Sequence, residues 1–381
     1  MGINFTRVTK NPLEDKDAMV FEVTSLRNYK VLAINPGSTS TKIAVFNGED
    51  TEVELTLRHS AEEISRFPSV IDQYEWRKSL ILNILAENNI DINSLSAVIG
   101  RGGLLRPIES GVYEVNQTMI DELKQCSPQH ASNLGAIIAS ESASLWNVKA
   151  YIADPVVVDE LDGVTRITGI KQIRRRSIFH ALNQKAMARK YADDIGRTYE
   201  ELNLIVAHLG GGISVGAHCK GRVIDCNNAL DGEGPITPER AGTIPAGDLI
   251  DLCYSGEYTH KQARSLLVGG GGFVALVGTN SVIDIQERAQ AGDKEAANAL
   301  DAMCYGVAKH IGQMAVALSG EVDAIIITGG IAHSNIVTEK ISSRCRFIAP
   351  IEIYAGENEL QALAMNAMRV LQGQTEAKIY Q

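Results

Sequence analysis

Two segments of this chain repeat one pattern, and the repetition limits the fold more than any other feature of the sequence. Each segment opens with an apolar run long enough for a buried strand, at residues 31–34 in the first copy and 204–207 in the second. A loop of small residues, an alternating strand, a turn pair and another strand follow, which is typical of a β-hairpin. The pattern predicts an α/β chain whose two lobes share one duplicated β-hairpin core.

The loop in each copy has the composition of an anion-binding turn. Residues 35–42 read NPGSTSTK, with four consecutive hydroxyl side chains and one lysine, and residues 208–214 read HLGGGIS. Backbone N–H groups of such small-residue loops can point toward one anion, such as a phosphate. A plain hairpin turn would explain the proline and the glycine but not the run of hydroxyls. We therefore expect two phosphate-binding loops that face each other across an interdomain cleft.

Composition limits the partners of the protein. The 381 residues carry a net charge of −10, which argues against a nucleic acid or an anionic membrane as a partner. No apolar stretch is long enough to cross a bilayer, and the six cysteines are scattered without a C-x-x-C pair. Reduced thiols in a cytoplasmic protein are the expected state. Residues 1–28 lack the apolar core of a secretion signal, and we expect them to form a leader outside the core fold.

Hydrophobic periodicity and turn residues divide the rest of the chain. We expect a first lobe of residues 29–156 together with 358–381, and a second lobe of residues 157–357. Helices are predicted at 67–88, 116–126, 131–144, 179–192, 248–254, 281–291, 295–318 and 358–371. Further strands are predicted at 97–100, 150–155, 324–328, 347–349 and 352–354. The chain contains no G-x-x-x-x-G-K-[ST] motif, which excludes a P-loop.

The chemistry-bearing motifs follow one another in an order that resembles the acetate and butyrate kinases. They are N-x-G-S-x-S-x-K at 35–42, R-G-G at 101–103, a strand-end Asp154, R-R-x-x-F-H at 175–180, H-L-G-x-G at 208–212 and Gly-Gly-Ile at 329–331. The series covers nearly all of residues 31–371, and its details, such as Gly211 in the fifth motif, resemble the butyrate kinase branch. The resemblance implies the actin-like ATPase fold, with two ribonuclease-H-like lobes around an interdomain cleft.

The resemblance also implies roles for single residues. A carboxylate and the terminal phosphate of ATP repel each other, so Arg101 and Arg240 are expected to clamp them and His180 to stabilise the transferring phosphoryl group. Asp154 is expected to be catalytic and, with Glu359, to position Mg²⁺ through water. Plainer interpretations are a turn former for Asp154, a packed helix residue for His180 and a first-turn helix acid for Glu359. The residues expected to bind the nucleotide and its phosphates are Asn35, Ser38, Ser40, Lys42, His208, Gly210, Gly211, Gly212, Gly329, Gly330, Ile331 and Asn335.

The implied reaction is ATP + short-chain carboxylate ⇌ ADP + acyl phosphate, by direct in-line transfer with Mg²⁺ and with butyrate as the favoured acid. A branched-chain, propionate or acetate kinase of the same family is an alternative, because one sequence does not identify the acyl pocket. A more distant alternative is a nucleotide switch, such as a chaperone or filament ATPase, although such a switch has no use for two arginines opposite the γ-phosphate. A homodimer or higher homo-oligomer is expected. Which of Arg174, Arg175 and Arg176 points into the site stays open.

Overall fold

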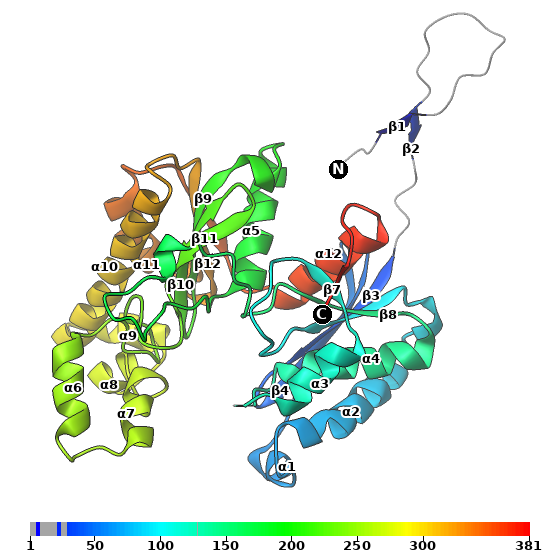
Figure 1. Cartoon of the computed structure of the whole chain (residues 1–381), viewed down its shortest axis with the longest axis horizontal. Coiled ribbons are helices and arrows are strands. Elements are labelled where there is room, and N and C mark those ends of the chain that lie inside the picture. The colour runs from blue at the N-terminus through cyan, green and yellow to red at the C-terminus, as the bar shows by residue number, and fades with distance from the viewer. Residues whose placement is uncertain (1–4, 8–20, 24–28, 128) are drawn as a thin grey trace, which may run out of the picture.

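A computed structural model of the chain describes residues 5–7, 21–23, 29–127 and 129–381. Two lobes lie side by side, and each is built around its own β-sheet with helices against it (Figure 1). None of the helices in these ranges is both long enough and apolar enough to cross a membrane.

The two sheets repeat one strand order. The first has seven strands in the order β14-β7-β8-β6-β3-β4-β5, and the second has five in the order β11-β10-β9-β12-β13. In both, a meander of three antiparallel strands continues into two parallel ones, so β5-β4-β3-β6-β8 matches the whole second sheet strand for strand. This match confirms the duplicated core. The strands are β3 (Lys30–Pro36), β4 (Ser40–Asn47), β5 (Asp50–Arg58), β6 (Ala97–Arg101), β7 (Val112–Glu114), β8 (Lys149–Ala153), β9 (Asn203–Leu209), β10 (Ile213–Cys219), β11 (Arg222–Cys226), β12 (Ala324–Gly329), β13 (Ile351–Ala355) and β14 (Lys378–Ile379).

Helices cover both faces of each sheet. In the first lobe α12 packs on one face and α2 and α4 pack on the other, whereas α5 and α10 cover the two faces of the second sheet. The helices are α1 (Ala61–Ser65), α2 (Tyr74–Glu87), α3 (Gln117–Gln125), α4 (Asn133–Trp146), α5 (Ala181–Asp194), α6 (Ala246–Tyr254), α7 (His260–Leu267), α8 (Phe273–Val277), α9 (Val282–Gln290), α10 (Lys294–Ala317), α11 (Asn335–Cys345) and α12 (Glu359–Leu371).

Two helices join the lobes. Helix α12 follows the last strand of the second lobe, yet its Leu363 and Ala367 pack into the core of the first. Helix α5 contributes Leu182 to that same core, while its Ala188 and Ala192 pack on the second sheet. The starts of both helices therefore lie at the junction between the lobes, where side chains of both lobes can meet.

The helix predicted at 67–88 begins later than expected. It starts at Tyr74, after a 3₁₀ turn at Ile71–Gln73. The backbone N–H and the hydroxyl of Ser69 both donate to Asp72. Such local bonds offer the backbone an alternative to the helix, which explains the shorter helix.

The strand predicted at 347–349 is wrong. The segment is a turn after α11, in which the Ile348 N–H donates to the Cys345 carbonyl oxygen. The Phe347 side chain is 83% exposed. Three apolar residues are too few to distinguish a strand from the end of a helix. The other predicted helices and strands form, with their ends shifted by a few residues.

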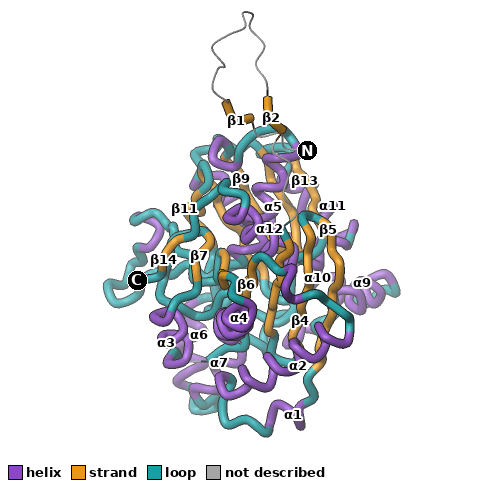
Figure 2. The backbone as a smooth tube through the Cα atoms, turned by 90° about the vertical axis from the view of Figure 1, so that its right-hand side faces the viewer, coloured by secondary structure: helices purple, strands orange, loops and turns teal. Residues whose placement is uncertain are grey.

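The expected leader at residues 1–28 falls mainly outside the described residues. Within it, β1 (Phe5–Arg7) and β2 (Phe21–Val23) pair with each other in a separate two-stranded sheet. Figure 2 shows both strands at the outer end of the molecule, beyond the sheets of the two lobes. The boundary of the leader at residue 28 stays a prediction.

Helix α4 contacts β6 through two glycines, and this contact fixes the strand end that carries Arg101. A Cβ added at Gly135 would lie 2.2 Å from the Arg101 carbonyl oxygen, and one added at Gly100 would lie 2.1 Å from the Gly135 carbonyl oxygen. Only glycine allows two backbones to approach this closely. The close contact between the backbones of α4 and β6 therefore fixes the position of Arg101.

Candidate active site

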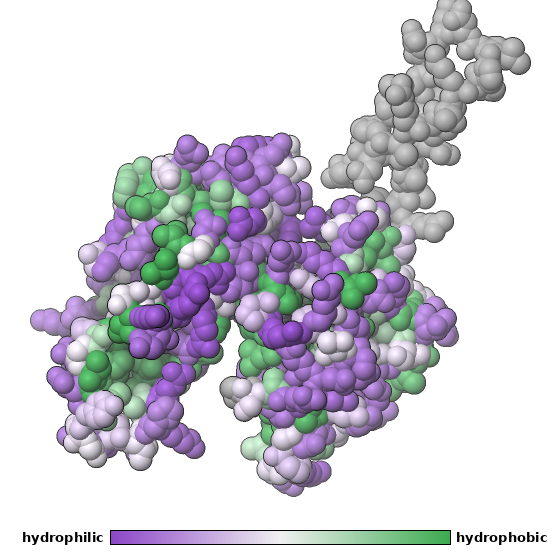
Figure 3. Space-filling model, in the orientation of Figure 1, coloured by the Kyte–Doolittle hydropathy of each residue, from purple (hydrophilic) through white to green (hydrophobic). Residues whose placement is uncertain are grey.

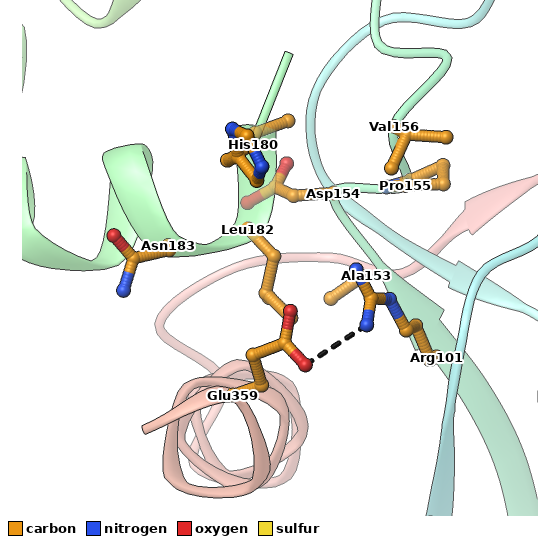
Figure 4. A pocket seen from close by; sticks show the side chains of 10 residues that line it. Arg101, Ala153, Asp154, Pro155, Val156, His180, Leu182, Asn183 and Glu359 are labelled. Atoms are coloured by element: carbon orange, nitrogen blue, oxygen red, sulfur yellow. Dashed lines mark hydrogen bonds and ion pairs between the residues drawn. The ribbon is translucent and has the colours of Figure 1, made fainter. Parts of the chain in front are cut away.

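A pocket opens where the two lobes meet. Its lining combines the ends of β6 and β8 with the starts of α5 and α12 (Figure 4). The space-filling view shows the wide hollow between the lobes (Figure 3). The lining residues are Arg101, Ala153, Asp154, Pro155, Val156, His180, Ala181, Leu182, Asn183 and Glu359. The pocket thus brings together four residues singled out from the sequence, namely Arg101, Asp154, His180 and Glu359.

Arg101 belongs to a small polar cluster at the edge of the first sheet. It ends β6, which pairs in parallel with β3, and Asn35 lies near the end of that neighbouring strand. Arg101 Nη1 donates to Glu359 Oε2 over 2.9 Å and to Asn35 Oδ1 over 3.3 Å. Asn35 Nδ2 donates to the same Glu359 oxygen. The Arg101 side chain is 27% exposed, so its remaining N–H groups can still reach a ligand.

Two stacked histidines lie across the pocket from this cluster. His180 directly precedes α5 and His208 lies in β9. Their ring centroids are 4.0 Å apart and the ring planes differ by 17°. His180 Nδ1 lies 2.7 Å from Ser214 Oγ, and His208 Nδ1 lies 2.8 Å from Asn183 Oδ1. The stack therefore places a predicted catalytic residue directly against a predicted nucleotide-binding residue.

The surroundings of His180 disfavour its charged form. Burial is the largest cause that lowers the pKa of His180 well below its usual value, and His208, Arg240 and Arg101 lower it further. Arg101 lines the same pocket as His180. His180 is therefore a neutral imidazole at neutral pH, and added negative charge beside it would favour its protonation.

Arg240 lies against the glycine loop of the second lobe. A Cβ added at Gly212 would lie 1.7 Å from Arg240 Nη1, so the guanidinium fills the space that a side chain there would need. The same Nη1 donates to the Ala229 carbonyl oxygen. Residues 270–272 pack against the segment that carries Arg240. Gly272 has a φ of 65°, and a Cβ added there would lie 2.0 Å from the Thr237 carbonyl oxygen. Only glycine suits that position.

Asp154 is turned into the protein. Its φ is 38°, and its Oδ1 accepts from the Ser110 hydroxyl over 2.6 Å and from the Gly111 N–H over 2.9 Å. Its Oδ2 accepts from Arg189 over 3.2 Å. Burial raises the pKa of Asp154, but Arg189, Lys185 and the two hydrogen bonds outweigh burial and lower it. The carboxylate is thus ionised and fully partnered, and its predicted catalytic and metal-binding roles stay predictions.

The carboxylates near the pocket differ in their fitness for Mg²⁺. Among the described residues, no group of three or more His, Cys, Asp or Glu side chains is placed to hold a metal ion. Mg²⁺ bound with a nucleotide needs only one or two carboxylates, because phosphates and water complete its shell. Glu359 Oε1 has no hydrogen-bond partner in the described ranges, whereas both Asp154 oxygens are occupied. Glu359 therefore has an oxygen available for a water-mediated Mg²⁺ contact, whereas the Asp154 oxygens already accept hydrogen bonds.

The first-lobe loop presents most of its predicted residues to the open side. Ser38 and Lys42 are exposed and Ser40 is partly exposed. Asn35, by contrast, is 7% exposed and is held in the Arg101 cluster. The hydroxyls and the lysine are therefore available to a phosphate, and Asn35 helps to orient the Arg101 side chain.

The second-lobe loops meet at the ends of β9 and β12. Gly329, with a φ of 93°, approaches so closely that a Cβ there would lie 2.3 Å from the Leu209 carbonyl oxygen. This contact sets the predicted residues at 329–331 beside those at 210–212. Asn335 is the first residue of α11 and is exposed. The loops and the N-terminus of α11 together form a surface suited to anionic phosphates.

Glu357 is a residue of the site that the sequence did not single out. Its Oε1 lies 3.1 Å from His208 Nε2 and 3.5 Å from the Gly330 nitrogen. The hydrogen bond with His208 is the largest cause that lowers the pKa of Glu357. Glu357 and the predicted Glu359 occur together in Gly-Glu-Asn-Glu. This motif indicates an acidic residue at the site, but it does not show which of the two acids takes part.

The arginine run at 174–176 does not supply a residue to the pocket. Arg175 turns inward, where it donates to Asp225 over 3.0 Å and to Glu233 over 3.4 Å. These three side chains line a second cavity instead. Arg174 and Arg176 are exposed.

Known proteins resemble this chain in sequence and in fold. The profile of the acetokinase family matches residues 164–369. A protein named "Probable butyrate kinase" of Clostridium botulinum strain Alaska E43 is 53% identical over 354 residues, which are 93% of this chain and 100% of that protein. Butyrate kinase 2 of Clostridium acetobutylicum is 53% identical over 92% of this chain and 99% of its own length. The crystal structure of Porphyromonas gingivalis acetate kinase has the same fold, with a TM-score of 0.74, 19% identity and coverage of 90% of this chain and 100% of that one.

The charge state of His180 can be measured directly. We expect the ring carbon shifts of His180 to stay those of a neutral imidazole from pH 8 to pH 6 without added nucleotide, because its pKa is lowered. The check is NMR of histidine-labelled protein, with the signal assigned by His180→Asn. A midpoint near about 6.5, the ordinary histidine value, would contradict the burial and the two nearby positive charges.

Proposed function

This chain belongs to the acetokinase family, and we propose that it phosphorylates butyrate in preference to other short-chain acids. As a member of this family, it is an ATP-dependent phosphotransferase whose acceptor is the carboxyl group of a short-chain acid. This activity excludes the alternative of a chaperone or filament ATPase. Relatives named as butyrate kinases, 53% identical over almost the whole chain, support butyrate as the acid.

One wall of the pocket supports butyrate as the preferred acid. Beside Arg101 the lining is aliphatic, with Ala153, Pro155, Val156 and Leu182. Such a wall can bury a short hydrocarbon chain while the guanidinium holds the carboxylate at its end. Each buried CH₂ group stabilises binding by about 0.8 kcal/mol. Butyrate has two more of these groups than acetate, which favours the longer acid as long as the wall can cover it.

The reaction requires orientation and charge neutralisation more than proton transfer. A carboxylate is already a nucleophile at neutral pH, so no general base is needed. Arg101 would hold the carboxylate, while Arg240 and His180 would stabilise the migrating phosphoryl group in line between the acid and ADP. The loops at 210–212 and 329–331 would hold the phosphates of the nucleotide. Closure of the lobes over the pocket would exclude water and limit hydrolysis of ATP.

Mg²⁺ is part of the proposal. Glu359 would hold the ion through water, and the ion would supply positive charge that offsets the charge of the nucleotide phosphates. The proposal also includes a homodimer or higher homo-oligomer in the cytoplasm. The six cysteines are scattered in the sequence without a C-x-x-C pair, which supports a reducing compartment.

The preferred acid can be determined with a hydroxamate assay for acyl phosphate, run on acetate, propionate, butyrate and isovalerate. We expect kcat/KM to be highest for butyrate, because the aliphatic wall favours a chain longer than acetate. A value for acetate equal to or above that for butyrate would show that the acid is wrongly assigned.

Arg101 variants test the clamp. Arg101→Ala should lower kcat by about 10²–10³-fold, the usual loss when a transition-state hydrogen-bond donor is removed. Arg101→Lys should recover little, because an ammonium cannot reproduce a two-pronged grip. The ATP dissociation constant should barely change, since the second lobe holds the nucleotide. Kinetics and ATP titrations of both variants are the measurements.

The matched control is Arg66→Ala, which removes an arginine that is 65% exposed and pairs with Glu62 on the surface. Its kcat should equal that of the unmodified enzyme. The clamp assignment fails if Arg101→Lys has near-normal kcat, or if Arg101→Ala loses ATP binding instead of turnover.

A further inference from the structure

A buried arginine that has no carboxylate partner among the described residues lies directly behind the first-lobe loop. Arg77 of α2 is 1% exposed, and Figure 1 shows this helix along the first lobe. Its guanidinium donates to the carbonyl oxygens of Gly37 over 2.8 Å, Ser40 over 3.2 Å and Ser38 over 3.3 Å. It also donates to the Thr41 hydroxyl over 3.1 Å. The planar fork of one side chain thus holds four oxygens of a single loop.

The remaining bonds of Arg77 are also to a neutral group. Its Nη2 and Nε donate to Gln73 Oε1, one turn earlier in the chain, over 2.7 and 3.1 Å. No carboxylate in the described ranges forms an ion pair with it. Burial lowers the pKa of Arg77 to about 10, which still leaves the group protonated at neutral pH. The positive charge is therefore solvated by dipoles but not cancelled.

The carbonyl contacts determine where the loop amides point. In a planar trans peptide, the C=O of one residue and the N–H of the next point in opposite directions. Because the Gly37 and Ser38 carbonyls point at Arg77, the N–H groups of Ser38 and Thr39 point away from it. Neither N–H donates a hydrogen bond to any residue that the structure describes. Both residues are exposed, so these amides face the open side of the loop.

We propose that Arg77 is a positioning residue for phosphoryl transfer, which holds the loop from behind so that the amides of Ser38 and Thr39 bind the transferred phosphate. Its positive charge, which no described carboxylate neutralises, also makes the electrostatic potential at these amides more positive. If Arg77 only stabilised the fold, it would hold the loop equally well with a carboxylate partner, and its charge would not need to stay free. This inference rests on the proposed function, because the loop matters for turnover only if a phosphate is transferred beside it.

Gln73→Glu separates positioning from stability. The new carboxylate has the shape of the amide and accepts the same two bonds, so the variant should fold with an unchanged or higher Tm. It neutralises the charge behind the loop, so we expect kcat to fall by about threefold to tenfold, a typical cost of weakened electrostatic preorganisation. The ADP dissociation constant should stay within twofold, because the second lobe binds ADP.

Arg77→Lys tests the fork itself. A lysine keeps the charge but cannot reach all four loop oxygens, so kcat should fall at least about tenfold. KM for the acid should change little. The control is Ile81→Val on the same helix, where Ile81 is fully buried in the hydrophobic core of the first lobe. It should lower Tm while kcat stays within twofold.

All variants are assayed on whichever acid the unmodified enzyme turns over fastest. A best acid other than butyrate therefore overturns the substrate assignment without affecting this test. The inference is overturned if Gln73→Glu and folded Arg77→Lys both keep kcat within twofold. If Arg77→Lys does not fold, Gln73→Glu alone decides, and normal kcat in it overturns the inference.

Discussion

Parallel pairing of the central strands is the constraint on which the rest of the structure depends. In each lobe the first strand of the hairpin pairs in parallel with a strand from later in the chain, β3 with β6 and β9 with β12. Their carboxyl ends then share one edge of the sheet, where ligands bind in α/β folds. This pairing sets Asn35 beside Arg101 in the first lobe and Leu209 beside Gly329 in the second. Both loops predicted to bind phosphate leave from these ends, so the duplication of the fold also duplicates the predicted binding surface.

Positive charge is the common physical property of the site. Arg101 is offset by one carboxylate, Glu359, whereas Arg77 and Arg240 form no ion pair among the described residues. Burial lowers the pKa values of both Arg77 and Arg240, which reflects the free energy cost of holding these charges. An acidic protein can therefore bind two anions that repel each other, because local charge and not net charge sets the potential in a cleft.

Patterns that are local in the sequence predict the fold, whereas contacts between distant residues decide the site. The hairpins are predictable because their apolar runs, small-residue loops and alternation are continuous in the chain. The position of Arg77 is not predictable, because an arginine in a helix is usually exposed and the Gly37 carbonyl that it binds lies 40 residues earlier. The orientation of Asp154 depends on a positive φ that a strand-end acid does not reveal. Glu357 enters the site only because the end of β13 brings Gly356 beside Gly329.

The central claim is that the phosphoryl group passes directly from ATP to the acid in the pocket between the lobes. The stereochemistry at phosphorus tests this claim most directly. ATP made chiral at the γ-phosphorus with three oxygen isotopes is converted with butyrate, and the configuration of the product phosphate is determined. A single in-line displacement predicts inversion. Retention would contradict the account, because it requires two displacements through a phosphorylated enzyme residue, for which His180 would be the first candidate.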